Sequence, residues 1–431
     1  MRTLKGLVLA AVVALAALAG RARAQRADGA TVESAILDIL LARGIITAEE
    51  YEELASLARA QVDASRGEIE LVEARLARLR APDIQARGGG PTQLRFESPD
   101  GTWSLGFSGR LQARAELFDS EDESQDDVNF SVPRARLTMG GNMGSPKAIW
   151  QIDIDAGTGK TLVDPATQPD TSLRNAFADF SQWRWASLRI GQFKFPYGRE
   201  IQISSNTLAF QERAVANDAF VPNFEPGAMV YGNLDDHIFE WWVAVSNGDG
   251  RGKNNSPGDE KNGLRTGARV VVNPLGPMPL DSTPFKTLET GDTLLSFGGS
   301  WMSNEDSSAI STVTPDVDTV SSGVDFQLFS GPFSLLSEVF HRRTDDDNAP
   351  NYDDDGSVVQ AGWLFNPHWE LVARWAEVDF ATRDDQGEKA LGVNWYLRGH
   401  DSKWQFDLAR LDNDGTTPDA SRLRLQYHMR F

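Results

Sequence analysis

The sequence predicts an all-β fold: a transmembrane antiparallel β-barrel of about 16 strands, preceded by a short N-terminal α-helical or coiled-coil segment. The first observation is the end of the chain, residues 421–431, where large apolar side chains alternate with polar or basic ones. A strand turns successive side chains to opposite faces, so this segment has one apolar and one polar face. Secondly, segments with this alternation number about sixteen, an even number, as single-chain bacterial barrels require. Thirdly, no later segment supplies the roughly 20 consecutive apolar residues of a membrane-spanning helix.

The first 24 residues are predicted to be a secretory signal peptide. Arg2 and Lys5 give a basic start, residues 7–18 form an apolar run, and small residues stand around the cleavage site at 22–24. This run is too short to span a bilayer as a mature helix. The chain contains no cysteine, so it has no disulfide, no thiolate metal site and no cysteine nucleophile. We therefore expect an exported protein that is either soluble or inserted as a barrel.

Residues 25–91 are predicted to form a periplasmic helical or coiled-coil segment followed by a hinge. Apolar residues recur at helical spacing from Ile36 to Leu41, and Gly44 breaks the run. Thr47 follows as the N-cap of a second helix, which runs into a coiled-coil pattern and ends at Pro82. Two interpretations stay open: a solvated helix without a special role, and a periplasmic oligomerisation segment.

Residues 92–431 are assigned to an outer-membrane β-barrel, because the period of the apolar pattern changes to two from Thr92 onward. Acidic runs and Gly/Asn-rich stretches separate the alternating segments and are predicted to be solvated loops. The predicted strands lie at residues 103–118, 130–141, 148–156, 173–182, 187–195, 227–234, 238–247, 264–272, 293–303, 320–329, 333–342, 357–365, 368–378, 389–397, 403–411 and 421–431.

The connectors between these strands are consistent with a barrel that has one short-turn end and one long-loop end. Starting from a periplasmic N-terminus, connectors after odd strands should be long and those after even strands short. The connector at 273–292, after the eighth strand, breaks this rule because it is long and proline-rich. The longest connector, about residues 196–226, follows the fifth strand.

A soluble β-sandwich or a secreted β-rich enzyme is the structural alternative, since its strands also alternate but bury their apolar face. The mean hydropathy is −0.37, and the 12 tryptophans include several at predicted strand ends, such as Trp150, Trp183 and Trp369. Aromatic residues at both interfaces are expected of a membrane barrel, whereas a sandwich would place them in its core. We adopt the barrel as the predicted fold.

The sequence offers no catalytic or cofactor-binding constellation. Its five histidines are scattered, with no HExxH pair and no GxSxG elbow. We therefore expect no enzyme activity, no cofactor and no resident metal. The net charge of −20, which becomes −24 once the four basic residues of the signal peptide are removed, argues against a nucleic-acid partner.

The informative constellation is basic. If the apolar side of each strand faces lipid, nine arginines face the lumen, because neighbours such as Leu111, Leu137 and Leu425 face outward. An arginine on the lipid side near the midplane would cost about 2–4 kcal/mol, so this register is well determined. Acidic residues share the lumen, which is therefore either a salt-bridged interior or a net-positive track for anions. The nine residues are Arg110, Arg114, Arg134, Arg136, Arg265, Arg269, Arg374, Arg422 and Arg424.

One stretch of the sequence resembles a known family. The segment Arg189–Glu200 (RIGQFKFPYGRE), followed by Phe210–Arg213 (FQER), resembles the phosphate-selective porin O and P family. The Asn247–Gly250 loop (NGDG) and the N-terminal residues 41–50 are similar to the same family. The resemblance implies a sixteen-stranded outer-membrane homotrimer that conducts anions through a constriction lined by arginine and lysine. It also implies that the 196–226 loop folds inward, with Lys194, Arg199 and Arg213 on or beside it.

We therefore expect an outer-membrane porin for passive diffusion of small hydrophilic solutes, with anions preferred and phosphate as a candidate. Its expected partners are small anions or other hydrophilic solutes, outer-membrane lipid, and further copies of the chain in a homotrimer. Two functions from other classes stay open. One is a structural protein that tethers the outer membrane to the cell wall through its N-terminal helices, and the other is a secreted or outer-membrane enzyme.

Overall fold

The computed structural model describes residues 32–44, 46–57, 94–122, 124, 126–158, 171–183, 185–234, 236–248, 250–251, 263–305, 317–346 and 349–431. The chain divides after residue 81 into two compact units, which are described separately. The predicted signal peptide, 1–24, and the predicted coiled coil and hinge, 58–91, lie outside the described residues.

The N-terminal unit contains the predicted pair of helices. Helix α2 (Val32–Ala42) is followed by a second helical run over residues 48–57. Thr47 caps the second run: the Glu50 N–H donates to Thr47 Oγ1 over 3.3 Å, and the Glu50 carboxylate accepts from the Thr47 N–H over 3.0 Å. This reciprocal arrangement satisfies two backbone donors at the helix start. No helix among the described residues is long and apolar enough to cross a membrane.

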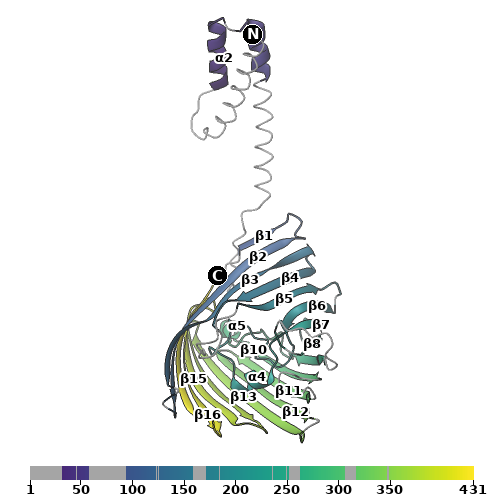
Figure 1. Ribbon diagram of the computed structural model, residues 1–431, viewed down its shortest axis with the longest axis vertical. Coiled ribbons are helices and arrows are strands. Elements are labelled where there is room, and N and C mark those ends of the chain that lie inside the picture. The colour runs from purple at the N-terminus through teal and green to yellow at the C-terminus, as the bar shows by residue number, and fades with distance from the viewer. Residues whose placement is uncertain are drawn as a thin grey trace. The chain divides into compact units, whose positions relative to one another are not determined.

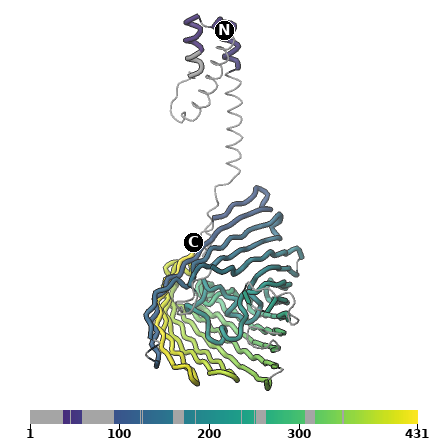
Figure 2. The backbone as a smooth tube through the Cα atoms, in the orientation of Figure 1, coloured from purple at the N-terminus to yellow at the C-terminus, as the bar shows by residue number. Residues whose placement is uncertain are grey.

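The second unit is a closed antiparallel β-barrel of 16 strands, β2 to β17 (Figures 1 and 2). Each strand pairs with its neighbour in the sequence, and β17 returns to pair with β2. Every predicted strand overlaps one of these sixteen, so the predicted β-barrel, its strand number and its strand positions are confirmed. The strands are β2 (Ser104–Ser120), β3 (Asp127–Ser145), β4 (Ala148–Asp155), β5 (Ser172–Phe180), β6 (Ser187–Lys194), β7 (Phe224–Leu234), β8 (Phe239–Ser246), β9 (Arg265–Val272), β10 (Thr293–Asn304), β11 (Val317–Ser330), β12 (Phe333–Asp346), β13 (Tyr352–Asn366), β14 (Trp369–Asp379), β15 (Asp385–Arg398), β16 (Ser402–Asp414) and β17 (Ala420–Arg430).

A further short strand, β1 (Leu94–Glu97), is not among the predicted ones. It pairs with residues 104–107 at the start of β2, on the same edge that β17 uses farther along. Between these two pairings, Gly109 and Phe431 exchange backbone hydrogen bonds of 2.7 and 3.0 Å. The strand therefore continues the closing seam past the last residue of β17. Four residues are too few for an alternating pattern to be recognised in a sequence.

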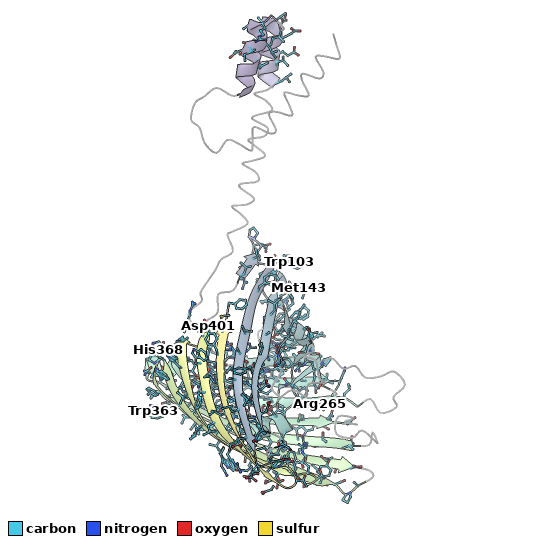
Figure 3. The ribbon with its side chains drawn as sticks, turned by 60° about the vertical axis from the view of Figure 1, so that its left-hand side comes forward. Trp103, Met143, Arg265, Trp363, His368 and Asp401 are labelled. Atoms are coloured by element: carbon cyan, nitrogen blue, oxygen red, sulfur yellow. The ribbon has the colours of Figure 1, made fainter. Side chains whose placement is uncertain are left out.

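The two ends of the barrel differ in their connections. Met143, near the end of β3, lies toward the same end of the barrel as His368 and Asp401, which belong to two of the short turns (Figure 3). Because neighbouring strands are antiparallel, the longer connectors with the acidic runs lie at the opposite end. Short turns face the periplasm in outer-membrane barrels, so the short-turn end is the periplasmic one.

Alternation holds along most strands: in β17, Leu425 is 44% exposed whereas Gln426 is fully buried. Strand β14 departs from this pattern because it carries apolar side chains on both faces. Trp375 points outward, while Val372, Ala376 and Val378 are buried on the inner side. An apolar inner face is unfavourable against a water-filled lumen, so it needs a cover.

The cover is the connector between β6 and β7, residues 195–223, which folds into the barrel and is called here the first inner segment. It includes the short helix α4 (Val215–Phe220). Tyr197 and Phe220 stack on Phe340 of β12, with ring centroids 5.9 and 5.6 Å apart. Burying such a side chain contributes about 1.5–3 kcal/mol. The inward fold expected for residues 196–226 is therefore present, although residues 224–226 already belong to β7.

The connector between β9 and β10, residues 273–292, enters the barrel from the short-turn end and is called here the second inner segment. It includes the short helix α5 (Phe285–Thr290). Asp281 pairs with His400 of the β15–β16 turn at 3.0 Å, and the Ser282 N–H donates to the Thr207 carbonyl over 3.2 Å. The two inner segments thus meet inside the barrel. The unusual length of this connector allows it to fill part of the lumen.

Candidate functional site

A cavity of about 630 Å³ lies in the lumen, between strands β17 and β2–β9 and the two inner segments. Eight cationic side chains line it, against two carboxylates. Within the described part of the chain, strands β10–β16 contribute no lining residue. The cations are Arg110, Arg136, Arg174, Arg189, Lys194, Arg199, Arg269 and Arg430, and the carboxylates are Asp153 and Glu240.

Arg110, Arg136, Arg174 and Lys194 gather on one side of this cavity and are called here the basic cluster. Ser205 of the first inner segment accepts hydrogen bonds from Arg110 over 3.2 Å and from Arg136 over 2.9 Å, which brings these two guanidinium groups together. Asp155 pairs with Arg136 and lies 3.7 Å from Arg174. Arg110 has no carboxylate of a described residue within ion-pair distance. The three arginines, which stay protonated, therefore exceed their carboxylate by two charges.

A β-bulge places Arg174 in the basic cluster. Between two regular pairs of β4 and β5, the residues Arg174 and Asn175 oppose the single residue Asp153. The extra residue interrupts strict alternation, and both Arg174 and Asn175 line the cavity. Asn175 donates a short hydrogen bond to Asp153, which fixes the local geometry.

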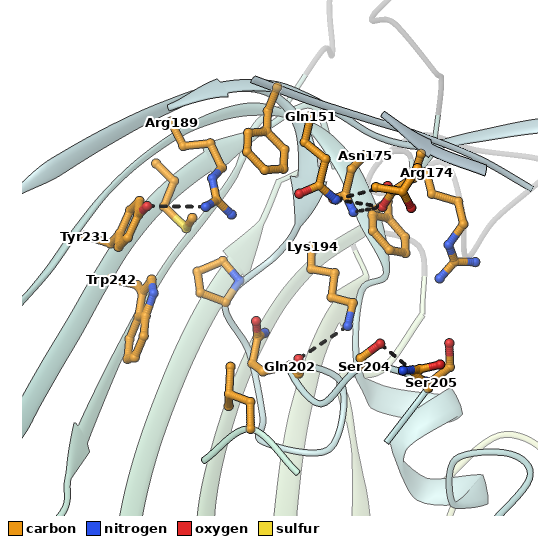
Figure 4. Close-up of a pocket in the computed structure, with 18 of the residues that line it drawn as sticks. Gln151, Arg174, Asn175, Arg189, Lys194, Gln202, Ser204, Ser205, Tyr231 and Trp242 are labelled. Atoms are coloured by element: carbon orange, nitrogen blue, oxygen red, sulfur yellow. Dashed lines mark hydrogen bonds between the residues drawn. The ribbon is translucent and has the colours of Figure 1, made fainter. Parts of the chain in front are cut away.

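The other side of the cavity combines Arg189 with aromatic residues of β7 and β8. Arg189 pairs with Asp179 at 2.6 Å and donates to the Tyr231 hydroxyl over 3.3 Å. Trp242 stands directly opposite Tyr231 in the β7–β8 pairing. Figure 4 shows Tyr231 and Trp242 to one side, Arg174 to the other, and Lys194 between them. The cavity therefore has a cationic side and an aromatic side.

A comparison with protein families assigns the chain. The family model for the phosphate-selective porin O and P matches residues 106–429, which is nearly the whole barrel. The chain belongs to this porin family. The protein is thus an outer-membrane channel and lies in the bacterial outer membrane. A relative described as an uncharacterized protein of Aquifex aeolicus (strain VF5) is 24% identical over 284 residues, covering 60% of this chain and 68% of that protein.

Solved structures share the fold of this porin. An anion-selective porin from Comamonas acidovorans has a TM-score of 0.52 at 12% identity and covers 76% of this chain and 100% of its own. The outer membrane channel DcaP of Acinetobacter baumannii has a TM-score of 0.54 at 11% identity and covers 78% of this chain and 99% of its own. At these identities the likeness shows the fold alone.

In this porin, Lys194 and Arg213 of the family motif hold the first inner segment in place. Lys194 donates to the carbonyl oxygens of Ile201 over 2.7 Å and Ile203 over 3.2 Å. Arg213 donates to the same Ile203 carbonyl over 2.7 Å. A segment that enters a barrel must find partners for its backbone carbonyls, and these two cations supply them. Lys194 also lines the cavity, whereas Arg213 does not.

Arg199, the third motif cation, shares a carboxylate with Arg269 of β9. Arg199 Nε donates to Asp325 over 2.9 Å, and Arg269 lies 2.5 Å from the other carboxylate oxygen of Asp325. Both arginines line the cavity, and together they exceed Asp325 by one charge. They extend the positive wall from the basic cluster toward β9.

Seven of the twelve site residues expected from the sequence face the barrel interior but lie away from the cavity. Arg114 and Arg134 both pair with Glu212 of the first inner segment, and Arg424 pairs with Asp407 at 2.7 Å. The interior therefore combines the two arrangements that the sequence left open: a salt-bridged part and a part with surplus positive charge. The seven residues are Arg114, Arg134, Arg213, Arg265, Arg374, Arg422 and Arg424.

Sequence reasoning missed three cavity arginines, Arg174, Arg189 and Arg430. Arg174 escapes any pattern of strict alternation because of the β-bulge. Arg189 and Arg430 obey alternation, since their neighbours Ile190 and Met429 are exposed on the outer face. Reading off the inward positions of β6 and β17 would have found both.

Proposed function

We propose that this porin mediates passive diffusion of small hydrophilic solutes and prefers anions to cations. The observation that supports this is the basic cluster, in which Arg136 and Arg174 share the single carboxylate of Asp155 while Arg110 lines the same cavity with Ser205 as its hydrogen-bond partner. Guanidinium groups replace part of the hydration shell of an anion, and several weak sites along a wall let the anion leave again. Phosphate is one anion of this kind, and the family description adds it to the proposal.

The acidic character of the whole chain opposes this preference only weakly. The net charge is −20, and much of it lies in runs such as 119–127 in the connectors between strands. At physiological ionic strength, exposed charges farther than about 8 Å from a path are largely screened. The arginines of the basic cluster border the path itself, so their surplus charge dominates the field that a solute meets.

The reversal potential of the reconstituted protein in a KCl gradient tests the anion preference. We expect the sign that corresponds to chloride carrying more current than potassium. A reversal potential of zero or of the opposite sign would refute the proposal. Replacing chloride by phosphate at constant ionic strength then measures the relative permeability of phosphate.

A homotrimer is also part of the proposal, supported by the membership of the chain in this porin family. The mass of the detergent-solubilised complex tests it, and a monomeric mass would refute it. The same measurement on a chain without residues 25–91 tests whether the N-terminal helices contribute. Loss of the trimer would assign the oligomerisation role to them, and an unchanged mass would remove it.

A further inference from the structure

The cavity has an apolar side that an inorganic anion does not use. Met229, Tyr231, Trp242 and Val271 line it from strands β7–β9, and Leu280 lines it from the second inner segment. Leu280 is 57% exposed, although its carbonyl accepts a hydrogen bond from Thr207 of the first inner segment. A solute with an apolar body that covers this side chain removes apolar surface from water, which is favourable.

Trp242 presents the aromatic face that is available to a solute. Arg189 lies over the rings of Phe177 and Tyr231, at 4.1 and 5.2 Å from their centroids. No cation of the described residues lies over the Trp242 ring. Trp242 is partly exposed, and its pairing with Tyr231 and Arg269 turns it toward the lumen.

The size of the cavity and its two sides point to one class of solute. About 630 Å³ falls within the roughly 300–1,000 Å³ of sites that bind small organic molecules. An inorganic anion at the basic cluster meets only the polar side and gains nothing from Trp242 or Leu280. An anion with an apolar body contacts both sides at once, because its headgroup faces the arginines while its body packs against the aromatic ring.

We propose that the preferred solutes of this porin are organic anions, in which a carboxylate or phosphate headgroup is joined to an aromatic or aliphatic body. This inference rests on the anion preference proposed above and narrows it to a substrate class. The basic cluster binds the headgroup, and Tyr231, Trp242 and Leu280 bind the body. Inorganic phosphate makes the headgroup contact with the basic cluster but has no body to contact the apolar side.

The test is the block of chloride current through the reconstituted full-length protein by matched pairs of anions. Benzoate and acetate share a carboxylate, while phenyl phosphate and inorganic phosphate share a phosphoryl headgroup. We expect the aromatic member of a pair to block at a concentration about tenfold lower than its partner. Equal half-blocking concentrations in both pairs would overturn the proposal. An advantage in one pair alone supports it and identifies the headgroup.

Variants of the apolar side test which residues carry the effect. Trp242→Ala is expected to remove most of the aromatic advantage, because it deletes the contact with the body and keeps every cation. Trp241→Ala is the matched control: this neighbour on β8 pairs with Val270, which is 46% exposed on the outer face. If Trp242→Ala does not assemble, Leu280→Ser takes its place, because Leu280 lies outside the strands. It too is expected to remove most of the aromatic advantage. An advantage that survives the available variant would overturn the proposal.

Failure of this inference is distinguishable from failure of the anion preference. A channel that passes potassium over chloride refutes the anion preference, whatever the organic anions do. A chloride-preferring channel that treats benzoate like acetate and phenyl phosphate like phosphate refutes the organic-anion class alone.

Discussion

Replacing Arg110 should weaken the anion preference by an amount that the structure allows to be estimated. With Asp155 counted, the three arginines of the basic cluster carry a surplus of two charges, which Arg110→Gln lowers to one and Arg110→Glu to zero. One unit charge about 6 Å from an ion in water contributes about 0.7 kcal/mol, and salt near 0.1 M roughly halves this. Because the anion loses what the cation gains, Arg110→Gln should lower the anion-to-cation permeability ratio about threefold, and Arg110→Glu about tenfold.

The assay for this prediction is the reversal potential in a KCl gradient near 0.1 M, the ionic strength at which these fold-changes apply. Lys389→Gln is the control, because it removes one charge from a side chain that is 66% exposed and pairs with Asp412 away from the cavity. It should leave the permeability ratio unchanged. The electrostatic reasoning is refuted if both Arg110 variants keep the ratio of the native protein, or if Lys389→Gln shifts it as much.

Three further predictions concern the inner segment, the barrel wall and an outer loop. Glu212→Gln leaves Arg114 and Arg134 without their shared carboxylate, and breaking such a buried pair costs about 3–5 kcal/mol. Amide exchange over residues 195–223 should therefore accelerate while the strands stay protected. Uniform exchange rates would contradict this. Gly141→Ala should lower the folded fraction seen by heat-modifiable gel migration, because an added Cβ overlaps the Ser104 carbonyl oxygen, whereas in the control Gly106→Ala the nearest atom is 3.5 Å away. Equal folded fractions would show that the wall tolerates the overlap. The pKa of Asp384 is lowered by hydrogen bonds from the Thr417 N–H and from Thr416, so this loop contact is intact above the usual value of about 3.9 and lost as the pH falls through the lower folded value. The protection factor of the Thr417 amide, which is the exchange rate of a free amide at the same pH divided by that of Thr417, should fall there, and Asp384→Asn should abolish that pH dependence.

The positions of the strands could be predicted from the sequence because lipid imposes a strict pattern on them. The last strand shows this directly: Leu425 must face hydrocarbon and Gln426 must not, and a shift by one residue would reverse both. The length of the connector at 273–292 also gave a signal, since a short turn would have sufficed at that end. Where the connector goes was not predictable, because its partners, such as His400, are far away in the sequence.

The roles of individual cations depend on pairing, which alternation does not describe. Arg134 and Arg110 both face inward in the strand pattern, yet Arg134 pairs with Glu212 from a distant segment, whereas the hydrogen-bond partner of Arg110 among the described residues is Ser205. Arg174 reaches the cavity through a bulge that inserts one residue into the ladder. Lys194, expected at a constriction, lines the cavity but donates its hydrogen bonds to backbone carbonyls of the inner segment.

The cavity lies on one side of the lumen, so the strands of the barrel form two arcs on which substitutions have different consequences. Within the described residues, the arc formed by β10–β16 contributes nothing to the lining, and its inward side chains pack instead against the inner segments. A substitution on this arc is tolerated when the interior still packs, so we expect Phe340 and Val358 to covary with residues 195–223. On the arc from β2 to β9, a substitution at a cavity-lining position affects which solutes pass. On this arc Gln151 and Asn175 line the cavity and donate hydrogen bonds to Asp153 rather than to the inner segments. These positions can therefore change with the solute while the packing of Phe340 and Val358 stays as it is.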